Sequence, residues 1–279
     1  AHMRVKLPDG GDRAYSLIHF GAVPGLPDDY RIAVQLEEES TGGSSFMHGL
    51  EVGQEVTASA PKCDFPVTPD APAVLLAGGI GITPMISMAA ELKSAGTPVE
   101  LHYAVRSRAL MAYGEELTDH LGEALHLHCD DDDSALELDA LIADLGARHF
   151  YICGPRGLID AARAKAEAAG VPADRVHVEL FDYASAGAAG DEAFEVEIAS
   201  TGEVVQVPAD KTIIEALEEA GHDLIYDCQR GDCGICQTDV LEGVPDHRDV
   251  VLSEEERASG KIMQICVSRA KTPRLKLDL

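Results

Sequence analysis

Four cysteines in the C-terminal third of the 279-residue chain have the spacing of iron–sulfur ligands. Cys228, Cys233 and Cys236 form a C-x4-C-x2-C pattern, and Cys266 follows after 29 intervening residues, 237–265. This is the spacing of plant-type [2Fe–2S] ligands. The low potential of such clusters, about −400 mV, suits electrons delivered by reduced nucleotides. The sequence therefore predicts a [2Fe–2S] cluster and an electron-transfer function.

A structural zinc site is the alternative, because it can also use four cysteines. Zinc sites more often combine one short C-x2–4-C pair with a second short pair, and the isolated Cys266 fits that pattern poorly. Gly231 and Gly234 permit the tight backbone that a cluster-binding loop needs. Three further cysteines, Cys63, Cys129 and Cys153, are scattered. Ligation of a cluster is therefore favoured over a disulfide framework.

A glycine-rich turn is the second feature with chemical potential. Gly78, Gly79 and Gly81 stand between an apolar strand and a predicted helix, in the segment LLAGGIGITPM of residues 75–85. Small residues let the backbone approach a pyrophosphate, and a helix N-terminus supplies amide donors. The pattern is not the G-x-G-x-x-G fingerprint. On this pattern alone, a tight strand–helix connection remains the alternative.

The segment His126-Leu-His128-Cys129, followed by four aspartates at 130–133, contains metal-ligating residue types. Its alternation of apolar and polar residues is typical of a strand that ends in a solvated acidic loop. Runs of like charge usually face solvent, so this interpretation is favoured over a metal site.

Three stretches of the chain must position these residues. Residues 4–68 hold short β-like runs, such as 14–18 and 31–36, separated by Gly, Pro and Asp clusters. Residues 69–183 alternate predicted strands (73–77, 99–105, 125–129, 149–153, 176–180) with predicted helices (84–95, 136–145, 158–169), which indicates a parallel sheet. Residues 184–191 have linker composition. Residues 192–279 begin with a hairpin, 194–198 and 203–207, followed by a short helix over 212–220.

The formal net charge of −27 argues against nucleic acid as a partner, because phosphate binding needs a basic face. It would suit docking to a basic patch on another protein, although most of the carboxylates are expected only to keep the surface soluble. No apolar run approaches the length of a membrane span. No secretory signal is visible, so we expect a cytoplasmic protein. Ala1-His2-Met3 is interpreted as a cloning remnant outside the fold.

The cysteine region resembles a known family. The segment Asp246–Asp249, the capped turn at Ser253–Glu256 and the segment Gln264–Arg269 are similar to the C-terminal domain of phthalate dioxygenase reductases, a family that includes vanillate demethylase reductases. Asp246–Asp249 either face the flavin domain or form a surface turn.

The glycine-rich turn resembles the Gly-Gly-x-Gly-x-Thr-Pro turn of the ferredoxin–NADP reductase superfamily, and residues 153–155 match its Cys-Gly-Pro motif. The resemblance implies that Thr83 and Cys153 position the nicotinamide. It implies nucleotide binding by Gly78, Gly79, Gly81, Thr83, Pro84, Cys153, Gly154 and Pro155.

Residues 13–16 match the Arg-x-Tyr-Ser flavin motif of the same superfamily. By resemblance, Arg13 pairs with the flavin phosphate, while Tyr15 and Ser16 contact the ring, with Ser16 near N5. The resemblance also implies a phosphate-binding turn formed by Gly42, Gly43, Ser44 and Ser45. It implies a strand beside the flavin that contains Ala33, Val34 and Gln35, and an aromatic side chain, Phe181, that covers the flavin ring. A solvated turn and ordinary core packing are the alternatives for residues 42–45 and for Phe181.

FMN is expected rather than FAD, because no adenine-binding segment is seen and the family uses FMN. Arg106 and Arg108 follow the strand at which the adenosine ribose would lie, and an arginine there can accept a 2′-phosphate. The resemblance nevertheless favours NADH over NADPH.

The resemblance implies a multidomain fold of three parts. These are an antiparallel β-barrel FMN domain, shortened at its N-terminus, in residues 4–68; an α/β nucleotide domain with a parallel sheet in residues 69–183; and, after the linker 184–191, an α+β β-grasp plant-type ferredoxin domain in residues 192–279. Family members begin earlier and close a six-stranded barrel. About four strands are expected here, which would leave the barrel with open edges. The sequence therefore does not settle whether this shortened domain holds FMN.

The function implied is that of the reductase component of a bacterial Rieske-type oxygenase system. It would take a hydride from NADH onto FMN and pass electrons to the [2Fe–2S] cluster and then to the oxygenase. The alternatives are a non-enzymatic [2Fe–2S] carrier with a defective flavin site, and a flavin or ferric reductase without an oxygenase partner.

Overall fold

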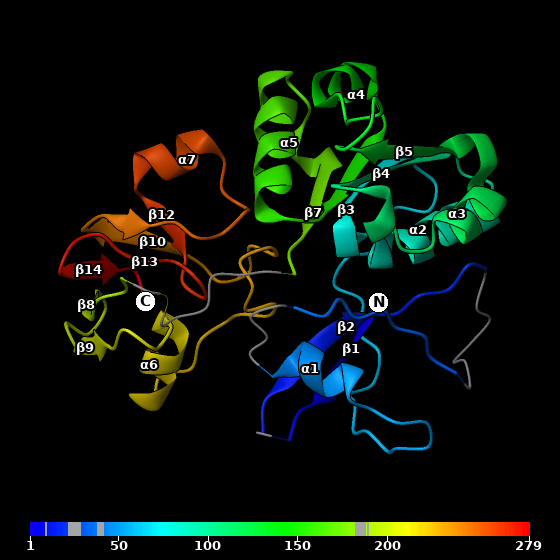
Figure 1. The fold of residues 1–279 in the computed structure, drawn as a ribbon. Coiled ribbons are helices and arrows are strands. Elements are labelled where there is room, and N and C mark those ends of the chain that lie inside the picture. The colour runs from blue at the N-terminus through cyan, green and yellow to red at the C-terminus, as the bar shows by residue number, and fades with distance from the viewer. Residues whose placement is uncertain (9, 22–28, 38–41, 182–187, 189) are drawn as a thin grey trace. The chain divides into compact units, whose positions relative to one another are not determined.

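The computed structural model describes residues 1–8, 10–21, 29–37, 42–181, 188 and 190–279 (Figure 1). It divides into two compact units, residues 1–181 and 182–279. Most of the predicted linker, at 184–187 and 189, lies outside the described residues. The predicted domain boundaries stay a prediction.

The first unit opens with two antiparallel strands, β1 (His2–Lys6) and β2 (Asp12–Ser16). Residues 57–62 run antiparallel beside β1, through bridges that pair His2 with Lys62 and Val5 with Ala58. The short helix α1 (Gly43–His48) follows in the chain before residues 57–62. These described residues account for part of an antiparallel flavin-type domain.

Two expectations for this region were wrong. Residues 31–36 form no regular strand, although the amide of Ile18 donates to the carbonyl oxygen of Arg31 across 2.8 Å. The side chains of Gln35 and Leu36 are exposed, so the alternation of residue types does not correspond to a buried face. His2 and Met3 lie within the fold, because they pair with Ser16 and Tyr15, and His2 is buried.

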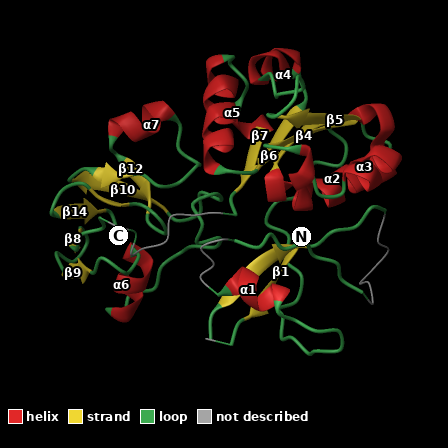
Figure 2. Cartoon of the chain, viewed as in Figure 1, coloured by secondary structure: helices red, strands yellow, loops and turns green. Residues whose placement is uncertain are grey.

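A five-stranded parallel sheet forms the rest of the first unit, in the order β5-β4-β3-β6-β7. Its strands and helices are β3 (Ala73–Gly78), η1 (Gly79–Gly81), α2 (Ile82–Ala95), β4 (Val99–Val105), η2 (Arg108–Leu110), α3 (Gly114–Leu121), η3 (Gly122–Ala124), β5 (Leu125–Cys129), α4 (Leu138–Asp144), β6 (His149–Cys153), α5 (Arg156–Ala168), η4 (Ala173–Arg175) and β7 (Val176–Glu179). Helices α2 and α3 lie on one side of the sheet and α4 and α5 on the other (Figures 1 and 2). The predicted α/β arrangement is confirmed.

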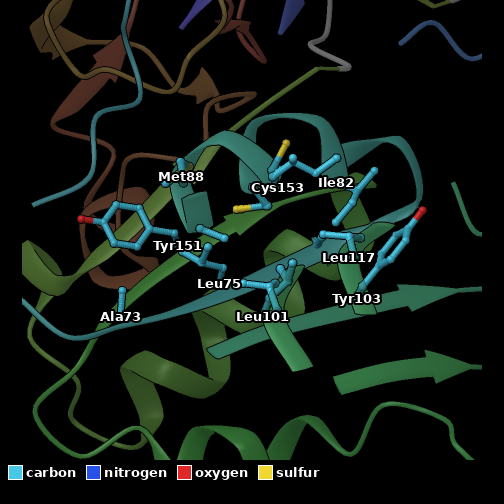
Figure 3. Close-up of a cluster of buried hydrophobic side chains, with 14 of the residues drawn as sticks. Ala73, Leu75, Ile82, Met88, Leu101, Tyr103, Leu117, Tyr151 and Cys153 are labelled. Carbon is cyan, nitrogen blue, oxygen red and sulfur yellow. The ribbon is translucent and has the colours of Figure 1, made fainter. Parts of the chain in front are cut away.

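The core of this unit packs α2 against one face of the sheet. Ile82, Met85 and Ile86 of the helix are buried together with alternate residues of the strands, such as Leu75 and Leu101. Figure 3 shows Ile82, Leu75 and Leu101 of this core, together with Cys153. Burying alternate strand residues on one face fixes the register of the strands, and therefore the position of each turn that follows a strand.

The second unit has a five-stranded mixed sheet in the order β12-β10-β14-β8-β9 and a two-stranded pair, β11 with β13. Its elements are β8 (Phe194–Ile198), β9 (Val204–Val207), α6 (Ile213–Glu219), β10 (Gln237–Glu242), β11 (Pro245–Asp246), α7 (Glu254–Ser259), β12 (Ile262–Gln264), β13 (Arg269–Ala270) and β14 (Arg274–Leu277). The α+β expectation and the first hairpin are confirmed.

Capping residues fix the two helices of this unit. Thr212 and Ser253 are the N-caps of α6 and α7, and each makes a capping box with the Glu three residues later. Beneath α6, the buried side chains of β8, β9 and β14 form the second core, which also includes Cys236 and Cys266. Among the described residues, no helix is long and apolar enough to span a bilayer.

Candidate functional site

The predicted cluster ligands lie on one tight loop and one turn. The loop that precedes β10 has positive φ at Gln229 (54°), Gly231 (79°) and Gly234 (80°). A β-carbon on Gly231 would lie 2.6 Å from Cγ2 of Val267 and 3.0 Å from Cα of Asp249. Glycine is therefore required at 231 both by the backbone conformation and by the space available. This packing brings the loop against the turn that carries Cys266.

The four thiols contact one another in this arrangement. A hydrogen bond with the Cys266 thiol lowers the pKa of Cys228 to about 3 and raises the pKa of Cys266. A hydrogen bond with Cys266 also lowers the pKa of Cys236. Burial raises the pKa of Cys233 to about 11. Cys228 and Cys236 therefore favour the thiolate form, which is the form that ligates metals.

The spacing of the sulfur atoms argues against a single tetrahedral ion. Four thiolates about 2.3 Å from one zinc ion lie roughly 3.8 Å from one another. Among the described residues, two groups of three or more ligating side chains have their ligand atoms within 4.8 Å of one another, and neither contains Cys228, Cys233, Cys236 or Cys266. No three of the four sulfur atoms therefore lie within 4.8 Å of one another, whereas three thiolates on one zinc ion would.

Two buried residues support the cysteine loop, and the spacing of the cysteines does not predict them. Asp249 is fully buried, and its Oδ2 accepts hydrogen bonds from the amides of Val251 (3.0 Å) and Leu252 (2.9 Å). Arg230 is buried within the loop, 3.3 Å from Asp232, and its amide donates to Sγ of Cys228 across 3.3 Å. The resemblance at Asp246–Asp249 was the available signal. The expectation of a surface turn does not hold for Asp249.

The nucleotide motifs meet at the carboxyl edge of the parallel sheet. A β-carbon on Gly81 would lie 2.2 Å from the carbonyl oxygen of Cys153, and one on Gly154 would lie 2.9 Å from Cα of Gly78. Two turns that are 72 residues apart (81 and 153) are therefore packed backbone against backbone. In open α/β sheets, ligands bind outside the carboxyl ends of the strands. Both motifs therefore lie at the edge of the sheet where ligands bind in this class of fold.

The side chains predicted to position the nicotinamide lie at this edge and are buried. Thr83 is buried in the first turn of α2, and its Oγ1 donates to the carbonyl oxygen of Ile80 across 3.1 Å. Cys153 is fully buried at the end of β6. Pro84 is also buried, while Gly154 and Pro155 begin the turn into α5. Their catalytic and binding roles stay predictions.

The two arginines after β4 have different surroundings. Arg108 is exposed and pairs with Asp132 in the loop after β5, with 2.9 Å between Nη2 and Oδ2. The hydrogen bond to Asp132 raises the pKa of Arg108. Arg106 is exposed at the end of β4. A carboxylate that already binds one of the arginines makes this edge less favourable for a 2′-phosphate.

The predicted flavin residues come together from separate parts of the first unit. A β-carbon on Gly43 would lie 2.8 Å from Cγ of Arg13, so the Arg13 side chain lies directly over the 42–45 turn. Ser44 is buried, and its Oγ accepts a hydrogen bond from the amide of Glu37 across 3.2 Å. The structure thus brings the expected guanidinium and the expected phosphate-binding turn together.

The remaining flavin candidates belong to the same unit of the chain. Tyr15 is half-buried and its neighbour Ser16 is buried, at the end of β2. Val34 accepts a hydrogen bond at its carbonyl oxygen from Nε2 of His48 in α1, across 2.9 Å. Phe181 is 37% exposed, so it does not pack as a core residue. The predicted flavin contacts of Tyr15, Ser16 and Phe181 stay predictions.

Comparison with known proteins identifies two domains by sequence. A family model described as "2Fe-2S iron-sulfur cluster binding domain" matches residues 196–271. A model described as "Oxidoreductase NAD-binding domain" matches residues 75–164. Both matches fall on the stretches for which the motifs predicted the same cofactors.

Relatives match the whole chain. The chain is 43% identical to the tetrachlorobenzoquinone reductase of Sphingobium chlorophenolicum, with 100% of this chain and 87% of the relative covered. It is 42% identical to the carnitine monooxygenase reductase subunit of Escherichia coli (strain K12), with 100% and 88% covered. A solved structure of phthalate dioxygenase reductase, described as modular for electron transfer from pyridine nucleotides to [2Fe–2S], aligns with a TM-score of 0.68, 34% identity and coverage of 100% and 87%.

Proposed function

The chain belongs to the phthalate dioxygenase reductase family of oxidoreductases, and from that premise we propose that it carries electrons from NADH through FMN to a [2Fe–2S] cluster and on to a Rieske-type oxygenase. The observation that carries the proposal is the geometry of the four cysteines. Their thiols contact one another, yet no three of them converge on one point as a single ion would require.

The cysteine loop fits a two-iron cluster. Cys228 contacts Cys233 and Cys266, and Cys236 contacts Cys266, so the four thiols form one connected group that can supply two thiolates to each iron. The Arg230 amide already donates to Sγ of Cys228, and such donors to sulfur tune the potential of a cluster. Cys233 is exposed, which places one edge of the group at the surface, where an electron acceptor can approach.

The flavin-binding residues fit FMN on the same kind of argument. Arg13 lies against Gly43, where only glycine leaves room for its side chain. A guanidinium fork at this position suits a phosphate dianion. When bound, FMN would convert the two-electron hydride of NADH into single electrons, and the cluster would carry them onward.

The role of the protein at the nicotinamide is positioning, and no acid–base residue is required. The close packing of Gly78 and Gly81 against residues 153 and 154 holds the two turns at a fixed separation. Thr83 and Cys153 then lie at the edge where a nicotinamide would be held.

The partner follows from the relatives. The carnitine monooxygenase reductase subunit is named as part of an oxygenase system. The net charge of −27 favours salt-sensitive docking to a basic surface on such a partner. A second candidate is direct reduction of a quinone, which is favoured by the 43% identity with tetrachlorobenzoquinone reductase.

An anaerobic titration with NADH, followed by visible absorbance, tests the electron path. We expect the flavin and cluster bands to bleach together. If NADH bleaches the cluster only after FMN is added, the path is present but FMN is weakly held. Cluster absorbance that NADH cannot bleach even with added FMN would overturn the proposal.

The acceptor is tested with a variant that lacks the cluster. Reduction of a one-electron acceptor such as cytochrome c should be lost in Cys266→Ser, because the electrons must pass through the cluster. Reduction of benzoquinone that persists in Cys266→Ser would favour the second candidate, because flavin alone would then reduce the quinone.

A further inference from the structure

Three histidines lie on one face of the parallel sheet in the nucleotide-binding part of the chain. His102 on β4 pairs in register with His126 on β5, and Ala104 pairs with His128. Side chains two residues apart along a strand lie on the same face. Glu100, two residues before His102, therefore joins the same face as the two β5 histidines. The buried strand residues Leu101 and Tyr103, which belong to the core with α2, occupy the opposite face.

The side chains of Glu100, His102 and His126 are close enough to bind the same metal ion. One ligand atom each from Glu100, His102 and His126 lies within 4.8 Å of the others. The rings of His102 and His126 are stacked, with centroids 4.5 Å apart and an interplanar angle of 21°. His126 is exposed and the other two side chains are half-buried, so an ion from solvent can reach them.

Hydrogen bonds fix the tautomers of the two neighbouring rings. Nδ1 of His128 lies 3.2 Å from the carbonyl oxygen of Ser134, so this nitrogen must carry the proton and donate it. Nε2 of His128 is then an acceptor, and it lies 3.1 Å from Nδ1 of His102, which donates to it. These two hydrogen bonds leave Nε2 of His102 with the lone pair that a metal needs. Metal-bound histidines typically donate their other ring N–H in this way.

The surrounding cavity provides room and negative charge. The side chains face a cavity of about 670 Å³, open to solvent, between the sheet and α4. Glu137 and Asp144 also line it, and Arg148 is its one lining cation. Arg148 binds Glu100 across 2.7 Å and Asp144 across 2.6 Å. The carboxylates that line the cavity outnumber its cation, so the field favours a bound cation.

We propose that Glu100, His102 and His126 form a binding site for a divalent transition-metal ion, with zinc the best match. Two imidazoles and one carboxylate, with water in a fourth position, are a ligand set that zinc accepts. Ligand atoms about 2.0–2.1 Å from a tetrahedral ion lie roughly 3.3 Å from one another. Closing from 4.8 Å or less to that distance is within reach of side-chain rotation. The site lies on the sheet face opposite the core that includes Cys153, so it is separate from the electron path.

Zinc binding to the full-length protein with its cluster and flavin in place tests the site. Calorimetric titration with Zn²⁺ is compared between the parent protein and His126→Gln, which removes an exposed ligand. We expect the parent to bind one Zn²⁺ and His126→Gln to bind it more than about 10-fold more weakly, since even loss of a partner of a metal ligand costs 10–100-fold. Zn²⁺ should also raise the thermal midpoint of the parent but not that of the variant.

The matched control is His222→Gln, which removes a half-exposed histidine from the other unit, where it lies 3.5 Å from Glu203. It should bind Zn²⁺ as the parent does. NADH oxidation by His126→Gln at the parent's rate would show that the variant is folded. Absence of zinc binding by the parent, or equal binding by His126→Gln, would overturn the site, and neither result would touch the proposed electron path.

Discussion

A β-carbon on Gly81 would lie 2.2 Å from the carbonyl oxygen of Cys153, a distance that no side chain can occupy. The turn after β3 and the turn after β6 are thus in direct backbone contact. The neighbouring glycines make the same point, since a β-carbon on Gly154 would lie 2.9 Å from Cα of Gly78. The glycines of both motifs are therefore required by their packing against each other, in addition to any contact with a nucleotide.

Gly81→Ala should separate these turns. The contact is with backbone atoms, which cannot rotate away, so we expect a loss of about 1–3 kcal/mol in unfolding free energy and a strong fall in NADH oxidation. Thermal unfolding and NADH oxidation measure the two effects. Gly157→Ala is the control, because nothing lies within 4 Å of its added carbon and it is helical. Equal behaviour of the two variants would contradict the packing argument.

Arg13→Ala should weaken FMN binding without unfolding the first unit. Losing a charge-assisted hydrogen bond to a phosphate costs roughly 1.5–3 kcal/mol, or about 10- to 150-fold in affinity. Retention of FMN on gel filtration and a fluorescence titration with free FMN measure the change. Arg4→Ala is the control, because Arg4 lies on β1 and pairs with Asp12 on the same sheet. Similar losses of FMN in both variants would argue against a specific role for Arg13.

Motif residues and regular elements could be predicted from the sequence, because their signals are local. Strands such as β3 and β6 are continuous apolar runs, and α6 and α7 begin at capping residues. Helix α3 was missed because its sequence, GEELTDHL, is largely polar and buries only Leu117 and Leu121. Residues 31–36 were wrongly predicted as a strand, because strand formation depends on pairing partners as well as on alternation.

The long-range relationships of the candidate site could not be predicted. The contact of Gly81 with Cys153 depends on β3 and β6 being adjacent in the sheet, which local sequence does not specify. The proposed metal-binding residues also come together only through the pairing of strands. The sequence drew attention to His126 together with the aspartates that follow it, whereas the register of β4 and β5 brings it to His102 and Glu100.

Asp132→Asn should increase the use of NADPH. Asp132 lies 2.9 Å from Arg108, so it offsets the charge that would attract a 2′-phosphate. Exposed ion pairs interact weakly, so kcat/KM for NADPH should rise by up to about 5-fold while that for NADH changes little. Asp130→Asn, an exposed neighbour, is the control. An equal rise in both variants would indicate a general charge effect.

The first unit should become less stable as the pH falls below neutrality, because of His177. Burial is the main cause of its lowered pKa, and its Nε2 lies 2.9 Å from Nδ1 of His149. The unfolded chain, with a pKa of about 6.5, then binds a proton that the folded chain does not, so stability is lost as the pH falls through 6.5.

Thermal midpoints measured between pH 7.5 and 5, where carboxylates stay ionised, test this effect of His177. His177→Gln should flatten the dependence relative to the parent. A parent-like slope in His177→Gln would contradict the assignment of the effect to that ring.

The cluster ligands are tested by changing cysteines one at a time. Cys228→Ala should abolish the cluster absorbance, because two of the other thiols contact Cys228 and each iron needs two thiolates. Flavin should remain and should still be bleached by NADH, since the flavin-binding residues belong to the other unit. Cys63→Ser is the control, because that cysteine is exposed and lies in the first unit. Iron content and the visible spectrum measure the result.

A cluster that survives in Cys228→Ala would exclude Cys228 as a ligand, whereas loss of both flavin and cluster would mean that the variant had misfolded. Only the selective loss of the cluster, with NADH-dependent cytochrome c reduction lost in parallel, agrees with an electron path in which the cluster follows the flavin.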